Sequence, residues 1–329
     1  MTRYCDRVKR AKPLLGTLVE ISLSGDGRED LHEAANAAFA EIARIHDLMS
    51  AHTRDSDVFH INNAPAQSVI SVDERTWRVL ELATEISQAS DGVFDVSVGA
   101  AMMARGTLPA LASRGYDAHA TYRDIELLPD CRVRLHRTLA VDLGGIAKGN
   151  AVDAAVEILK RKGVAAGCVN AGGDLRAFGE EAATVQVRDP LAPERARAQI
   201  ELRDRALATS ASYANDRGFN ASGEVLDPRA DNPVAAGRSA TVRAAQCAVA
   251  DALAKCVLMM GESSAPLLAR FRAEGFLIDG DMQTLIDSPA RPHNSGTASA
   301  STPGVAAPRD RSGNDSVALS HNGFSRAMT

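Results

Sequence analysis

Glycines, a carboxylate and a lysine come together in the segment Val141–Gly149, which reads Val-Asp-Leu-Gly-Gly-Ile-Ala-Lys-Gly. Glycines let backbone N–H groups approach an oxyanion, a following helix presents the positive end of its dipole, and Lys148 adds a formal charge. An ordinary strand-to-helix turn explains the same spacing, and on spacing alone it is the better explanation. The segment is not a G-x-G-x-x-G dinucleotide loop, and the chain contains no G-K-[ST] phosphate loop.

A second pair of residues, Asp251 and Lys255, lies one helical turn apart. On an exposed helix face, this spacing gives an ion pair that stabilises by a few tenths of a kcal/mol. The surrounding residues are small or apolar, which favours a buried helix instead. A buried carboxylate needs a cation or hydrogen-bond donors, so either Lys255 or a metal ion is expected beside Asp251.

Other polar residues in the chain carry weaker signals. The acidic residues Asp95, Asp174 and Asp227 occupy turn-like settings, where each is typical of a turn or a helix cap. His52 and His60 are eight residues apart and show no metal-ligand spacing. Taken singly, none of these residues marks a site.

The elements that would position these groups follow from hydrophobic periodicity and turn residues. A strand over Leu139–Leu143 is expected to lead through the two glycines into a helix that ends near Gly163, followed by a strand over Gly167–Asn170. A helix over Ala244–Met260 is apolar nearly all round and is therefore expected to be buried. Further helices are expected over 28–49 and 73–87, and further strands over 14–23, 91–98, 184–187, 198–202, 239–242, 275–278 and 284–286.

Composition limits the class of protein. The chain has 329 residues, 45% of them hydrophobic, which suffices for one large domain or two closely packed ones. A formal net charge of −5 and an aromatic content of 4% argue against nucleic-acid binding. No run approaches the roughly 20 apolar residues of a membrane helix, so stable membrane insertion is not expected.

The two ends of the chain and its cysteines lead to three expectations. The N-terminal residues have no apolar segment with a small-residue cleavage site, and five scattered cysteines form no disulfide framework, so a cytoplasmic location is expected. From Ser288 onward, the chain is rich in Ser, Ala, Gly, Pro and Asn. A folded domain over residues 1–287 and a disordered tail over 288–329 are therefore expected.

Several short motifs, taken in order, resemble the ApbE family of FAD:protein FMN transferases. The resemblance covers about residues 12 to 287. The motifs that carry it are Leu15-Gly16-Thr17, Met49-Ser50, Ser56-Asp57 through Ile61-Asn62, Asp91–Val96, Asp142–Gly149 with Ala151–Asp153, Asn170–Asp174, Ala208–Ser210, Leu226–Arg229 and Ala250–Ala254.

The resemblance implies an α+β fold of duplicated T-fold-like units with FAD bound in a cleft between them. It implies transfer of FMN from FAD to a Thr or Ser hydroxyl of a target flavoprotein, with release of AMP. It also implies a metal ion, usually Mg²⁺, held by the Ala147 carbonyl, the Asp251 carboxylate and the residue at 255. Contacts to the flavin and adenosine would fall on Met49, Asn62, Asp95, Lys148, Asp153, Gly172 and Gly173.

The chain departs from the family's pattern at the reaction centre. Lys255 stands where the family has a threonine, and Glu224 stands where it has a histidine that is the expected catalytic residue. The loop that begins at Ser210 also lacks the usual Gly-Asp. An ammonium at position 255 would repel Mg²⁺ and pair with Asp251.

These departures leave three functions open. In an active FMN transferase, Glu224 would serve as the base and Lys255 would supply part of the positive charge. In a non-catalytic FAD-binding protein, a flavin carrier or regulator, Lys255 would hold the diphosphate without splitting it. An FAD pyrophosphate hydrolase would use water as the acceptor.

Overall fold

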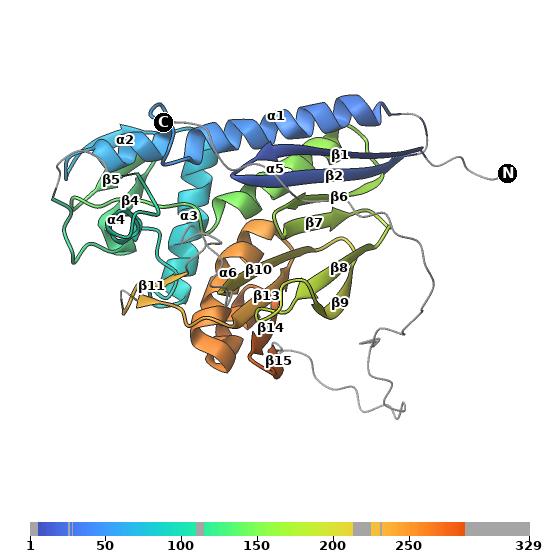
Figure 1. Ribbon diagram of the computed structural model, residues 1–329. Coiled ribbons are helices and arrows are strands. Elements are labelled where there is room, and N and C mark those ends of the chain that lie inside the picture. The colour runs from blue at the N-terminus through green and yellow to red at the C-terminus, as the bar shows by residue number, and fades with distance from the viewer. Residues whose placement is uncertain are drawn as a thin grey trace, which may run out of the picture. The chain divides into compact units, whose positions relative to one another are not determined.

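An eight-stranded antiparallel sheet forms the centre of the protein in a computed structural model that describes residues 6–286 except 26, 28, 110–114, 213–224 and 231. The strand order is β1-β2-β6-β7-β10-β13-β14-β15 (Figure 1). The strands are β1 (Asp6–Leu14), β2 (Thr17–Gly25), β6 (Ala166–Ala171), β7 (Asp174–Phe178), β10 (Ala206–Ser212), β13 (Arg238–Ala244), β14 (Glu274–Asp279) and β15 (Met282–Ile286).

The sheet consists of two four-stranded halves. They join where Leu175 and Arg176 of β7 pair with Leu207 and Ala206 of β10. The strands of the first half are far apart in the sequence, because β2 pairs with β6 in a register that sets Val19 opposite Ala171. The α+β class is confirmed, and the two halves match the expected duplication.

Three helices form a layer on the sheet. Helix α1 (Leu31–Met49) packs on β1 and β2, α5 (Ala147–Arg161) on β6 and β7, and α6 (Cys247–Met260) on β10 and β13 (Figure 1). Neighbouring helices of this layer also contact one another. Most of α6 is buried, as its apolar composition predicts.

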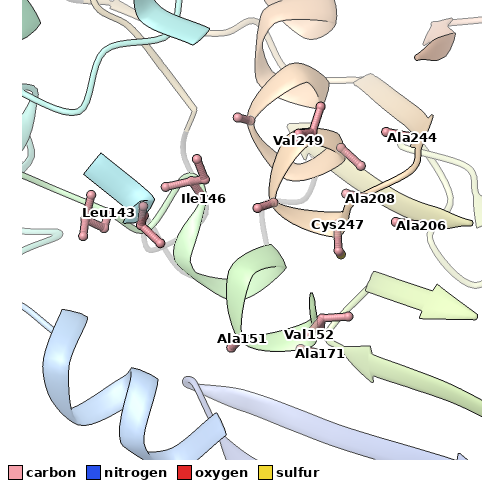
Figure 2. Close-up of a cluster of buried hydrophobic side chains, with 14 of the residues drawn as sticks. Leu143, Ile146, Ala151, Val152, Ala171, Ala206, Ala208, Ala244, Cys247 and Val249 are labelled. Carbon is pink, nitrogen blue, oxygen red and sulfur yellow. The ribbon is translucent and has the colours of Figure 1, made fainter. Parts of the chain in front are cut away.

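Small side chains allow α5 and α6 to pack closely on the sheet. Figure 2 shows part of this core, in which alanines of the sheet face residues of both helices. The labelled members are Leu143, Ile146, Ala151, Val152, Ala171, Ala206, Ala208, Ala244, Cys247 and Val249. Burial of this apolar surface fixes the two helices that carry Lys148 and Lys255.

A smaller module is inserted between β2 and β6. It contains a three-stranded sheet in the order β3-β5-β4 together with helices, of which α3 is the longest (Figure 1). Its elements are α2 (Asp57–Asn63), β3 (Val69–Ser71), α3 (Glu74–Ala89), α4 (Gly99–Ala104), a 3₁₀ turn at Tyr122–Asp124, β4 (Ile125–Leu128) and β5 (Arg132–Leu135).

The remaining elements lie in the second half of the chain. They are the hairpin β8 (Ala183–Arg188) and β9 (Ala196–Leu202), the pair β11 (Leu226–Asp227) and β12 (Asn232–Pro233), the 3₁₀ turn Gly261–Ser264 and α7 (Ala265–Arg270). The tail expected over 288–329 lies outside the described residues, so its disorder and the domain boundary stay predictions.

Two expected strands are wrong. The segments 91–98 and 139–143 belong to none of the sheets and share one isolated parallel bridge, Val98 with Ala140. Asp91 and Gly92 have positive φ and form a turn, and the Asp95 carboxylate accepts a hydrogen bond from the Ser97 N–H. Asx-type hydrogen bonds of this kind compete with strand pairing, which explains the error.

The expected strand over 14–23 is also wrong at its start. Leu15 and Gly16, both with positive φ, form a tight turn between β1 and β2, so the second strand begins at Thr17. Primed turns of this type suit hairpins because their twist matches that of the strands. The basic residues before the turn form a complete strand, β1, that the sequence analysis did not identify.

Gly149 sets the separation of α5 and α6. A Cβ atom at this position would lie 2.4 Å from the Cys247 carbonyl oxygen and 2.7 Å from Ala248 Cα. We expect Gly149→Ala to lower the free energy of unfolding by about 1–3 kcal/mol, because overpacking outweighs the gain in helix propensity. Chemical denaturation measures the change.

Gly115→Ala is the matched control, because a Cβ atom there meets nothing within 4 Å. It should leave the free energy of unfolding unchanged. Equal stability of the two variants would contradict the close approach of the helices at Gly149.

Candidate functional site

A cavity of about 360 Å³ lies between the two halves of the sheet unit and the inserted module. Its wall is formed in part by helices α5 and α6, by the glycine turn before α5 and by strand β10. The lining residues are Val93, Phe94, Asp95, Val96, Val98, Met102, Asp142, Gly144, Gly145, Lys148, Gly172, Thr209, Ser210, Ala211, Val225, Leu226, Pro228, Lys255 and Met259.

Four charged side chains form a cluster, of which Lys148 and Lys255 line the cavity. Lys148 of α5 forms an ion pair with Asp174, which begins β7, and its Nζ lies 3.9 Å from Asp251 Oδ2. Lys255 Nζ lies 2.5 Å from Asp251 Oδ1. Both carboxylates are buried, Asp174 at 2% and Asp251 at 1% exposure. The cluster therefore contains one cation for each buried carboxylate.

The cluster keeps Lys148 charged. Burial alone would lower the pKa of Lys148, but the negative charges of Asp251 and Asp174 outweigh it, so the pKa lies above its ordinary value. Burial and the charge of Asp251 raise the pKa of Asp174 to about 6. At neutral pH, Lys148 presents a fixed ammonium to the cavity.

Lys255 is the cation that the buried Asp251 requires. Its ammonium donates to Asp251 Oδ1, to the Asp251 carbonyl oxygen at 3.0 Å and to Ser210 Oγ at 3.4 Å. The other carboxylate oxygen of Asp251 accepts the Gly149 N–H at 3.1 Å. Of the two partners that the sequence left open, a lysine and a metal ion, the structure places the lysine at Asp251.

The donor set around Asp251 does not fit Mg²⁺. Magnesium requires near-octahedral oxygen ligands at about 2.0–2.1 Å. Both carboxylate oxygens of Asp251 already accept hydrogen bonds, one of them from an ammonium. No group of three or more His, Cys, Asp and Glu side chains that could hold a metal occurs among the described residues.

Four of the residues assigned by resemblance line the cavity: Asp95, Lys148, Gly172 and Lys255. Asp95 is held by the N–H groups of Ser97 and Tyr122, and burial raises its pKa. Gly172 has φ of 66°, and a Cβ atom there would lie 2.5 Å from Thr17 Oγ1. Only glycine fits this turn without displacing Thr17.

Other assigned residues are not among those that line this cavity. Met49 is in the hydrophobic core at the end of α1, Ala147 is the first residue of α5, and Gly173 donates its N–H to Asn170 Oδ1. The buried side chain of Asn62 donates to the Val141 carbonyl and accepts the Val141 N–H. Asn62 therefore fixes the strand-like segment that precedes the glycine turn. Its expected contact to FAD stays a prediction.

Asp153 caps helix α6 from the neighbouring helix. Its carboxylate accepts the N–H groups of Cys247 and Ala248, each at 2.9 Å, and pairs with Arg176 at 3.0 Å. Gln246, at the N-cap position of α6, makes no side-chain cap of its own. Asp153 thus joins α5 to α6, and its assignment to FAD stays a prediction.

Glu224, the assigned base, lies outside the described residues. The next residues in the chain, Val225 and Leu226, line the cavity.

Sequence reasoning missed the roles of Asp174, Asp142 and Ser210. Asp174 was interpreted as a turn residue but holds Lys148 in place. Asp142 lines the cavity and accepts the Gly144 N–H, and burial raises its pKa. Ser210 contacts Lys255 across 45 positions in the chain. The only sequence signal for these residues was their presence in the ordered motifs.

Comparisons with known proteins agree with this architecture. A family model described as the ApbE family matches residues 15–277. An FAD:protein FMN transferase from Vibrio cholerae is 27% identical over 276 residues, covering 78% of this chain and 82% of the relative. Another, from Klebsiella pneumoniae, is 26% identical and covers 61% of this chain and 66% of the relative. The crystal structure of the ApbE protein from Thermotoga maritima matches with a TM-score of 0.73 and 26% identity, covering 84% of this chain and 97% of that protein.

Proposed function

Since the chain belongs to the ApbE family, we propose that it is an FAD:protein FMN transferase, which moves FMN from FAD to a Thr or Ser hydroxyl of a target flavoprotein. The observation that carries this proposal is the cavity in which Lys148 and Lys255 lie beside the glycine turn before α5. Such a wall of ammonium groups, glycines and a helix N-terminus suits a diphosphate.

The proposed reaction exchanges the phosphoanhydride bond of FAD for a phosphate ester bond to the acceptor. The acceptor hydroxyl oxygen attacks the phosphorus of the FMN half of FAD, forming a new O–P bond. The bond from that phosphorus to the bridging oxygen breaks, and the bridging oxygen leaves as part of AMP. Glu224 takes the hydroxyl proton as general base.

The described residues bind and orient in this proposal. Lys148, fixed by Asp174, places a positive charge against the diphosphate, where charge builds up on the leaving group. The turn at Gly172 brings backbone close to the cavity without a side chain in the way. The family resemblance also suggests Mg²⁺, but no step here depends on it, because the donor set at Asp251 does not fit the ion.

An assay of products tests the proposal. The purified full-length chain is incubated with FAD and a target-domain peptide that carries the acceptor hydroxyl. We expect the peptide to gain the mass of one FMN less one water, with one AMP released per transfer. A peptide with alanine in place of the acceptor residue is the control.

The two alternative functions give different results in the same assay. FAD that is bound but remains intact would overturn the transferase and indicate a flavin carrier or regulator. AMP released without peptide modification would instead indicate an FAD pyrophosphate hydrolase.

We also propose that the protein acts in the cytoplasm, without stable membrane insertion and without nucleic acid as a partner. Its acidic net charge of −5 supports the second exclusion. Among the described residues, one helical stretch, Cys247–Arg270, is long and apolar enough to cross a membrane by length and composition. The first part of that stretch is α6, whose apolar residues pack against the sheet.

A further inference from the structure

Lys255 is the only lysine besides Lys148 that lines the cavity within the part of the chain that the structure describes. Its side chain leaves α6 beside the glycine turn, and its Cε lies 3.2 Å from the position of a Cβ atom on Gly145. The ammonium and the backbone of the turn therefore border the same space. Helix α5 begins directly after this turn, and its N-cap residue, Ile146, makes no side-chain cap.

One of the N–H donors of Lys255 has only a weak acceptor in the protein and can bond to a ligand instead. A lysine ammonium has three N–H donors. Two of them have close acceptors on Asp251, but the third reaches Ser210 Oγ at 3.4 Å, near the limit for a hydrogen bond. A phosphate oxygen in the cavity would be a shorter and stronger, charge-assisted partner.

A metal ion beside Asp251 would compete with this arrangement. It would have to displace the ammonium from Asp251 Oδ1 and would leave Lys255 as an unpaired cation in a largely buried position. Burying an unpaired charge is unfavourable. The side chain of Lys255 is 18% exposed, so it has little room to move into solvent.

We propose that Lys255 supplies to the FAD diphosphate the positive charge that a divalent metal ion would otherwise supply, so that this chain binds FAD without a metal at Asp251. The inference rests on the proposed function for its ligand. The protein itself then supplies two positive charges at the diphosphate: Lys148, which is paired with Asp174, and Lys255, which is paired with Asp251.

Two measurements on the parent chain test the inference. Titration with FAD is followed by flavin fluorescence in buffer with Mg²⁺ and in buffer with EDTA, and equal affinity is expected. Titration with Mn²⁺, a spectroscopic substitute for Mg²⁺, is followed by electron paramagnetic resonance, and no stoichiometric site is expected. Tighter FAD binding in Mg²⁺, or one bound Mn²⁺ per chain, would overturn the inference.

Variants at position 255 are expected to change FAD affinity and Mn²⁺ binding in the same measurements. Lys255→Met removes the charge, and we expect FAD affinity to fall about 10-fold to 100-fold in both buffers, as for loss of a charged hydrogen bond. Lys255→Thr supplies a hydroxyl oxygen, so Mn²⁺ binding should appear, and Mg²⁺ should restore FAD affinity. Lys160→Thr, which changes a surface lysine on α5, is the control. Unchanged FAD affinity in correctly folded Lys255→Met would also overturn the inference.

The proposed function and this inference fail in different ways. A parent chain that binds no FAD in either buffer would contradict the proposed function. The Mn²⁺ titration does not require FAD, so it still decides whether Asp251 holds a metal ion. A parent chain that binds FAD equally in both buffers but transfers nothing would support the inference and contradict only catalysis.

Discussion

The Glu224→Gln variant is expected to transfer FMN about 100-fold to 10,000-fold more slowly than the parent chain, the range over which general acid–base catalysis contributes. Glutamine keeps the size of the side chain but cannot accept the proton of the attacking hydroxyl. FAD affinity should stay near the parent value, because the cations of the cavity are unchanged. Single-turnover formation of flavinylated peptide measures the rate, and flavin fluorescence measures binding.

Two further variants make this result specific. Glu201→Gln makes the same change at an exposed residue of β9 and should transfer at the parent rate. Glu224→His offers a different base at the same position and should retain transfer. A Glu224→Gln protein that transfers as fast as the parent would show that Glu224 is not the base.

The Asp251→Ala variant is expected to lose about 3–5 kcal/mol of unfolding free energy, as when one partner is removed from a buried ion pair. The change leaves the ammonium of Lys255 without its carboxylate and the N–H of Gly149 without its acceptor. FAD binding should weaken as well, because Lys255 loses the group that holds it at the cavity. Urea denaturation and FAD titration measure the two effects.

The exposed pair of Glu74 and Arg78 provides a matched control. It has the same i, i+4 spacing on a helix, but its side chains are 63% and 70% exposed. Glu74→Ala should cost at most about 0.5 kcal/mol, because solvent screens such pairs. If both alanine variants lost equal stability, burial of Asp251 would not explain its contribution.

The sequence predicts those elements best whose determinants are local. Helices α1 and α3 begin within three residues of their expected starts, where Asp30 and Asp73 cap them, and the apolar pattern predicted the buried α6. The pair of Asp251 and Lys255 was also foreseeable, because four residues on a helix bring side chains together.

Contacts between distant segments could not be predicted from the residues alone. Asn62 is hydrogen-bonded to the backbone of Val141, which is 79 residues away in the sequence. Asp153 caps α6 by a bond to the N–H of a residue that is 94 residues away. The motif resemblance selected both residues, but nothing in the sequence indicated that their polar atoms are bonded to the backbone of other segments. Turn chemistry at Asp91 and Gly92 likewise overrode the apolar alternation that predicted a strand.

The pairing of β2 with β6 affects how the chain must fold as it is synthesised. Val19 pairs with Ala171, so the inner edge of the β1–β2 hairpin stays unpaired while roughly 150 further residues are added. At a translation rate of about 5–20 residues per second, that interval is roughly 8–30 s. An open strand edge can pair with other chains during this time. Because the module between β2 and β6 is complete before β6 emerges, it can form its own small sheet first, and the cavity can be completed only after α6 is added.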